Sequence, residues 1–111
     1  MKEIWKEIQG YNGLYLISNY GIVMDSDGHI IRPGITETGF LQIDLFRDNR
    51  SVKAYHIHKL VADHFLSNPN NLPEVRHLDG NKKNNRLDNL EYTSEIKKPR
   101  KWIYLGKLRT W

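Results

Sequence analysis

The chain has 111 residues, which is enough for one small domain with a modest core and too few for two. It contains no cysteine, which excludes disulfides and cysteine-ligated zinc and suits a reducing compartment. The net charge of +4 is unevenly spread: residues 1–50 hold five Lys or Arg and seven Asp or Glu, whereas residues 51–111 hold twelve and six. A basic second half favours a polyanion such as DNA as the partner.

The amino terminus begins with charged residues, and no apolar run approaches the length of a signal-peptide core or a membrane span. We therefore expect a cytoplasmic protein that does not bind a membrane.

The first half alternates short apolar runs with turn residues, a pattern typical of antiparallel strands. Runs at 14–18 and 21–24 flank a turn at 19–21. The turn 25–28 leads into a run at 29–32, which stops at Pro33-Gly34, and further runs follow at 40–45 and 52–56. The pattern predicts a meander of short antiparallel strands.

Several short motifs near the amino terminus occur together, at residues 3–8, 10–11, 13–15 and 18–21. In this combination they resemble the small N-terminal module that precedes HNH cores in homing endonucleases. The resemblance implies a small sheet laid on DNA, with basic residues after the Ser-Asn-Tyr-Gly turn. This chain has Ile22 and Met24 there, and exposed apolar residues would suit a protein interface instead.

Residues 58–66 break the alternation, because their apolar positions recur at the spacing of one helix face. We predict a short amphipathic helix that ends before Pro69, since the residue preceding a proline avoids the helical region. The segment resembles the His-Arg-Leu-Val-Ala helix that precedes the HNH hairpin, with Lys59 replacing the arginine. His58 and His64 fall on different helix faces, so we interpret the histidines of this region as packed or exposed rather than zinc-binding.

Residues 75–91 carry the most specific signal in the chain. His77 ends a short apolar run, and the turn 79–81 follows because glycine and asparagine accept a positive φ. Asparagines at 84, 85 and 89 can fix a loop through their side-chain amides. The stretch resembles the HNH endonucleases of the phage and intron-homing type, whose hairpin reads His-x-Asp-Gly-Asn, Asn-Asn-Arg and Asn-Leu-Glu.

The resemblance implies an α+β fold, in which a small antiparallel β meander precedes a helix and an HNH-like ββα core (the His-Me finger). It divides one compact unit into an N-terminal β-rich module at 1–57, the core with its preceding helix at 58–98, and a basic aromatic tail at 99–111. We recognise no counterpart of the tail in the family, and its alternation predicts an added strand or a segment docked on the sheet. A phage-encoded protein acting in the host cytoplasm fits this family.

In the HNH family the histidine at the His77 position activates water for attack on a phosphodiester, a role that suits a side chain with a pKa near neutrality. Asp79, Asn85 and Asn89 occupy the structural positions of the motif. The family holds one Mg²⁺ or Mn²⁺ ion, with a ligand immediately before the histidine, where this chain has Arg76. A guanidinium has no lone pair to donate and repels a divalent cation.

The second family ligand lies on the helix after the second strand, and counting along this chain reaches Lys98, or Ile96 if two residues are deleted. Neither side chain is a suitable ligand, and Pro99 disfavours a helix at Lys98. Asp79 is a weak candidate ligand, because the glycine turn beside it favours a role in fixing the loop. We therefore expect a retained scaffold with a degenerate metal pocket and no assigned cofactor.

Three functions stay open. The first is a DNA-binding protein of this family with weak or lost nicking, in which Arg76, Lys82, Lys83 and Arg86 hold phosphates and Arg76 stands where the metal would. The second is an active nickase that uses His77 as general base with Mg²⁺ or Mn²⁺ in an unconventional shell. The third is a phage-type protein that binds and inhibits a host protein through the same scaffold. The target DNA sequence and the oligomeric state do not follow from the sequence.

Overall fold

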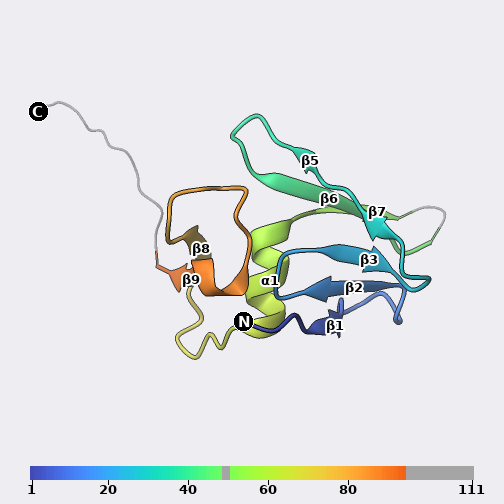
Figure 1. Cartoon of the computed structure of the whole chain (residues 1–111), viewed down its shortest axis with the longest axis horizontal. Helices are drawn as coiled ribbons and strands as arrows, with labels where there is room; N and C mark the ends of the chain where they lie inside the picture. The colour runs from blue at the N-terminus through green and yellow to red at the C-terminus, as the bar shows by residue number, and fades with distance from the viewer. Residues whose placement is uncertain (49–50, 95–111) are drawn as a thin grey trace, which may run out of the picture.

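The computed structural model describes residues 1–48 and 51–94 of the chain. These residues form two small antiparallel sheets, one α-helix and a two-stranded hairpin (Figure 1). The predicted α+β class is confirmed for this part of the chain. The third element expected for a ββα core and the 99–111 tail lie outside the described residues.

The first sheet is built from four short strands that follow one another in space as they do in sequence. They are β1 (Trp5–Glu7), β2 (Tyr15–Ser18), β3 (Val23–Asp25) and β4 (Ile30–Ile31). The turn between β3 and β4 forms because the Asp25 carboxylate accepts hydrogen bonds from the backbone amides of Asp27 and His29. The predicted strands on either side of the 19–21 turn are confirmed.

The second sheet contains β5 (Gly34–Ile35), β6 (Leu41–Phe46) and β7 (Val52–His56), with β6 in the middle. The predicted meander is thus divided between two sheets. The division falls at Pro33, which has no backbone donor for a strand ladder and so ends the first sheet. The short strand β5 has no alternating pattern of its own, and the sequence did not predict it.

The helix α1 (Ile57–Phe65) follows β7 directly and contacts both sheets and the hairpin. Its buried face includes Ile57, Leu60, Val61 and Ala62, which join residues of both sheets in one apolar core. The chain becomes extended at Leu66, before Asn68 and Pro69, as predicted. Among the described residues, no helix has the length and apolar character needed to cross a membrane.

The hairpin consists of β8 (Glu74–His77), a 3₁₀ turn η1 (Leu87–Asn89) and β9 (Leu90–Thr93). In its antiparallel register Arg76 lies opposite Glu91 and His77 opposite Leu90. Val75 and Leu90 are buried in the core beside α1. The prediction that His77 lies on the first strand of a hairpin is confirmed.

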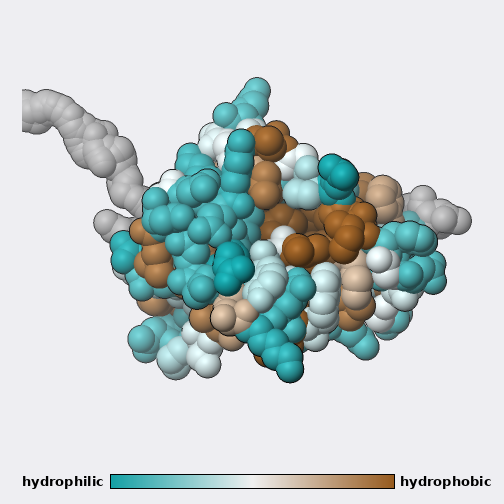
Figure 2. Space-filling view, in the orientation of Figure 1, coloured by the Kyte–Doolittle hydropathy of each residue, from teal (hydrophilic) through white to brown (hydrophobic). Residues whose placement is uncertain are grey.

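The surface differs between the hairpin and the two sheets. Figure 2 shows hydrophilic atoms over the hairpin side and apolar atoms gathered over the sheets. The exposed large apolar residues of the sheets include Ile30, Ile35, Phe46 and Val52. Ile22 and Met24 are half-buried, and Met24 pairs with Leu16 on one side and Ile30 on the other. Ile22 and Met24 therefore contribute only part of their side chains to the apolar surface of the sheets.

Candidate active site

The loop between β8 and β9 is organised around the Asp79 carboxylate. Its Oδ1 accepts hydrogen bonds from the Asn81 backbone amide at 2.8 Å and the Asn89 amide nitrogen at 2.9 Å. Its Oδ2 accepts one from the Asn84 side chain at 2.9 Å. The Asn84 side chain, followed by the Asn81 amide and the Asn89 side chain, holds the pKa of Asp79 below its usual value. Asp79 is thus a loop-fixing residue with both oxygens engaged.

Asn89 connects both ends of this loop. Its side-chain oxygen accepts the Asp79 backbone amide at 3.1 Å, and its nitrogen also donates to the Asn84 carbonyl at 2.8 Å. The side chain is buried, so these bonds form away from water. The prediction that Asn89 hydrogen-bonds the loop backbone is confirmed.

His77 is held by the neighbouring asparagine of the same loop. Its Nε2 lies 2.7 Å from the Oδ1 of Asn85, which is 4% exposed. Since an amide oxygen can only accept a hydrogen bond, Nε2 carries the proton in this arrangement. The lone pair is then on Nδ1, which is the nitrogen that can accept a proton from water.

A stack of aromatic rings lies beside His77, and the sequence did not predict it. The His58 ring is 4.8 Å from that of His77 and 5.2 Å from that of His56, and Phe40 lies 5.0 Å from His58. Burial lowers the pKa of His58 to about 4, with further contributions from the charges of His77, His56 and Lys59. His58 is therefore a neutral ring at neutral pH. His56 and His58 bracket the junction of β7 and α1, but only the tertiary fold brings His77 to them.

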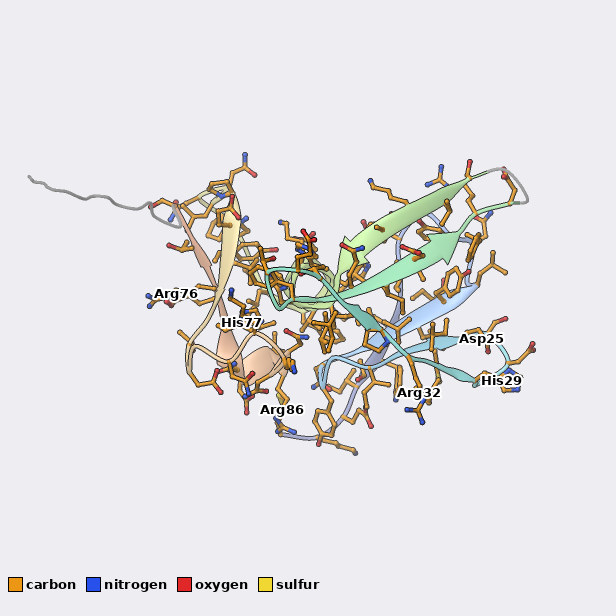
Figure 3. The ribbon with its side chains drawn as sticks, turned by 90° about the horizontal axis from the view of Figure 1, so that it is seen from above. Asp25, His29, Arg32, Arg76, His77 and Arg86 are labelled. Atoms are coloured by element: carbon orange, nitrogen blue, oxygen red, sulfur yellow. The ribbon has the colours of Figure 1, made fainter. Side chains whose placement is uncertain are left out.

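Arg76 points away from this stack. Figure 3 shows its side chain directed outward from the hairpin, whereas His77 is directed toward the sheets. Adjacent residues of a strand face opposite sides, which accounts for the difference. The Arg76 Nε donates to Glu91 Oε2 at 2.8 Å, and the two residues form a cross-strand ion pair.

The other predicted phosphate-binding cations line the same loop. The Lys82 ammonium donates to the Thr38 carbonyl at 2.7 Å and lies 4.8 Å from the centre of the Phe40 ring. The Arg86 guanidinium lies 4.5 Å from the centre of the Tyr20 ring. A surface cleft of about 190 Å³ opens beside His77, and its lining consists of Phe40, Val75, Arg76, His77, Gly80 and Lys82.

The two predicted ligand positions among the described residues do not fit a divalent ion. Arg76 offers no lone pair, and the Asp79 oxygens are occupied by the loop. The alternative ligand positions Ile96 and Lys98 lie outside the described residues. In the part of the chain that the structure describes, the one group with metal-ligand spacing is Asp25, Asp27 and His29. Figure 3 shows Asp25 and His29 well separated from His77.

Comparisons with known proteins agree with this geometry. The family model described as the NUMOD4 motif matches residues 3–46. The chain is 37% identical over 92 residues to the DNA endonuclease I-HmuI of Bacillus phage SP01, and the match covers 82% of this chain and 52% of the relative. It is also 37% identical over 89 residues to the uncharacterized HNH endonuclease L245 of Acanthamoeba polyphaga mimivirus, covering 73% of this chain and 27% of that protein.

A solved structure described as "DNA binding and cleavage by the HNH homing endonuclease I-HmuI" superposes with a TM-score of 0.73. That match has 38% sequence identity and covers 82% of this chain and 52% of the other. The chain thus spans about half the length of I-HmuI.

Proposed function

This chain belongs to the HNH homing endonuclease family, and we propose that it is a DNA-binding protein whose metal-dependent nicking is weak or lost. One contrast carries the proposal. Asn85 holds His77 in the Nε2–H form, which leaves the Nδ1 lone pair for a general base, but the position before it holds a guanidinium paired with Glu91. A divalent ion supplies several kcal/mol of transition-state stabilisation to phosphodiester hydrolysis, and a guanidinium at the family's ligand position cannot bind one.

DNA is the proposed partner because cations surround the cleft beside His77. Lys82 lines the cleft, Lys83 is an exposed neighbour on the same loop, and Arg86 follows after the paired asparagines. Lysine and arginine contacts to phosphate give binding that depends little on sequence. Arg76 becomes a further phosphate contact if its ion pair with Glu91 opens. The similarity to a relative named as a DNA endonuclease supports the same partner.

The host-protein alternative has less support, because the apolar positions that motivated it are half-buried. The active-nickase alternative would need Mg²⁺ or Mn²⁺ to be held by residues beyond those described. A location in the cytoplasm of a phage-infected host is part of the proposal.

The test is to incubate the purified protein with supercoiled plasmid and Mg²⁺ or Mn²⁺, beside the variant His77→Ala. We expect little nicking above that of the variant, while both proteins bind the plasmid at low salt. Efficient Mg²⁺-dependent nicking that disappears in His77→Ala would instead support the active nickase. No DNA binding by either protein at low salt would overturn the proposal.

A further inference from the structure

We infer that the turn at residues 18–21, part of the N-terminal module, positions the reactive histidine by holding Asn85 against it. Gly21 is the positioning residue in this arrangement. The inference rests on the proposed function only in taking His77 as the histidine of interest. The turn therefore has a positioning role within the protein that does not depend on any contact with DNA.

The turn is itself rigidly held. The Ser18 hydroxyl accepts hydrogen bonds from the backbone amides of Tyr20 and Ile22, and Gly21 donates to the Ser18 carbonyl at 2.9 Å. The Asn19 side chain accepts the Ile4 amide at 2.8 Å. Ser18 is completely buried and Asn19 is 3% exposed. A turn fixed in this way can act as a support for whatever packs on it.

The hairpin loop packs on this turn at three successive residues. The Leu87 amide donates to the Asn19 carbonyl at 2.8 Å, and the Arg86 guanidinium stacks on the Tyr20 ring. Asn85 lies against Gly21. The contact therefore joins β2 and β3 of the first sheet to the loop that holds His77.

Gly21 is required by this approach for two reasons. Its φ of +86° is a conformation that residues with a Cβ rarely adopt. A Cβ at this position would also lie 2.9 Å from the Asn85 carbonyl oxygen and 3.0 Å from the Asn85 Cβ. Such distances are too short for non-bonded atoms, and the obstacle is mostly backbone, so either the turn or Asn85 would have to move.

Movement of Asn85 would also move the hydrogen-bond partner of His77, because few other contacts fix the side-chain amide of Asn85. Its Oδ1 bonds His77 at 2.7 Å, but its Nδ2 is buried and has no hydrogen-bond partner among the described residues. Packing, rather than a second hydrogen bond, thus sets the direction of the Oδ1. A displaced Asn85 would no longer favour the Nε2–H form of His77 over the Nδ1–H form.

The experiment compares Gly21→Ala with Gly28→Ala as a matched control. Gly28 has nearly the same backbone conformation, with φ +88°, but a Cβ there would meet nothing within 4 Å. The control therefore carries the same backbone strain without touching Asn85. Nitrogen-15 NMR of the histidine rings measures which nitrogen of His77 is protonated. It uses free protein, without DNA or metal, so failure of the proposed function does not affect the result.

We expect His77 to be the Nε2–H tautomer in the parent and in Gly28→Ala, and a mixture of tautomers in Gly21→Ala. The single variant Asn85→Ala should show the same mixture of His77 tautomers. The double variant Gly21→Ala with Asn85→Ala should show no further change in that mixture. If Gly21→Ala does not fold, Tyr20→Leu loosens the same contact from the Arg86 side and should shift the tautomer in the same direction. An unchanged His77 ring in a folded Gly21→Ala protein, or equal changes in Gly21→Ala and Gly28→Ala, would overturn the inference.

Discussion

The Asn89 side chain makes more hydrogen bonds in the loop than that of Asn84, although both are asparagines of the same motif. Asn89 is buried and bonds the Asp79 amide, the Asp79 carboxylate and the Asn84 carbonyl. The Asn84 side chain makes one exposed bond to Asp79. The difference lies in how many backbone groups each side chain satisfies.

Replacing Asn89 by Ala should therefore lower the free energy of unfolding by about 2 kcal/mol, because it leaves the Asp79 amide and the Asn84 carbonyl, both in part-buried hydrogen bonds, without these partners. Asn84→Ala is the matched control and should cost less than about 1 kcal/mol. Urea denaturation of both variants measures the two losses. Equal losses would show that Asn89 does not pin the loop.

The buried ring of His58 should make stability depend on pH. Its pKa is about 4 in the folded protein and 6.5 ordinarily, so below pH 6.5 the unfolded chain binds a proton that the folded chain does not. The free energy of unfolding should fall between pH 6.5 and pH 4, by up to about 3 kcal/mol from this group. His58→Phe keeps a ring beside His77 and should flatten this part of the curve. His29→Gln removes an exposed histidine and is the control. A loss of stability between pH 6.5 and pH 4 that persists in His58→Phe would show that His58 is not its cause.

The hairpin sets a condition on any attempt to restore a metal ligand. Arg76 and Glu91 face each other across β8 and β9, and both are about half exposed. Such a pair contributes at most about 1 kcal/mol. Arg76→Asp would place two carboxylates directly opposite, which destabilises a strand pair.

We expect Arg76→Asp alone to lower the melting temperature, and Arg76→Asp with Glu91→Gln to recover it. The double variant should then gain some stability from added Mn²⁺, but only partly, because the second family ligand position falls on Ile96 or Lys98, whose side chains are not suitable ligands. Arg76→Leu removes the cation without adding a ligand and serves as the control. If the parent and Arg76→Leu respond to Mn²⁺ as strongly as the double variant, the ion binds elsewhere.

The elements that the sequence predicted are those whose signals are local. Strand alternation at β2, β6 and β7, the helical spacing of α1 and the Asp79-Gly80 turn each depend on neighbouring residues. The family resemblance added the hairpin and the role of Asn89. These predictions agree with the structure in type and nearly in bounds.

The features that sequence reasoning missed depend on contacts between distant residues. The His58–His77 ring pair, the Lys82–Thr38 bond and the close approach of Gly21 to Asn85 join segments far apart in the chain. No periodicity encodes such partners. The pairing of Arg76 with Glu91 could have been found, because it follows from the hairpin register once His77 is placed opposite Leu90.

The hairpin is connected to both sheets by polar contacts as well as by the core. Leu87 and Asn19 link it to the first sheet, and Lys82 and Thr38 link it to the turn between β5 and β6. The division of the chain into segments 1–57, 58–98 and 99–111 remains a prediction. These links hold the loop that carries Lys82, Lys83 and Arg86, and Lys82 also lines the cleft beside His77.

DNA binding should therefore depend most on the cations of the hairpin loop. Replacing Lys82, Lys83 and Arg86 by Ala should weaken binding to all DNA sequences alike, and should reduce the slope of log affinity against log salt by up to about 3. Replacing Arg32, Arg47 and Lys53 removes the same charge from the ends of β4, β6 and β7, and Figure 3 shows Arg32 well away from His77. This control should change the slope less, because its effect is only through net charge. Fluorescence anisotropy with two unrelated duplexes over a range of salt concentrations measures both slopes. A decrease of the slope in the control variant as large as that in the loop variant would show that the loop cations are not the main DNA contacts.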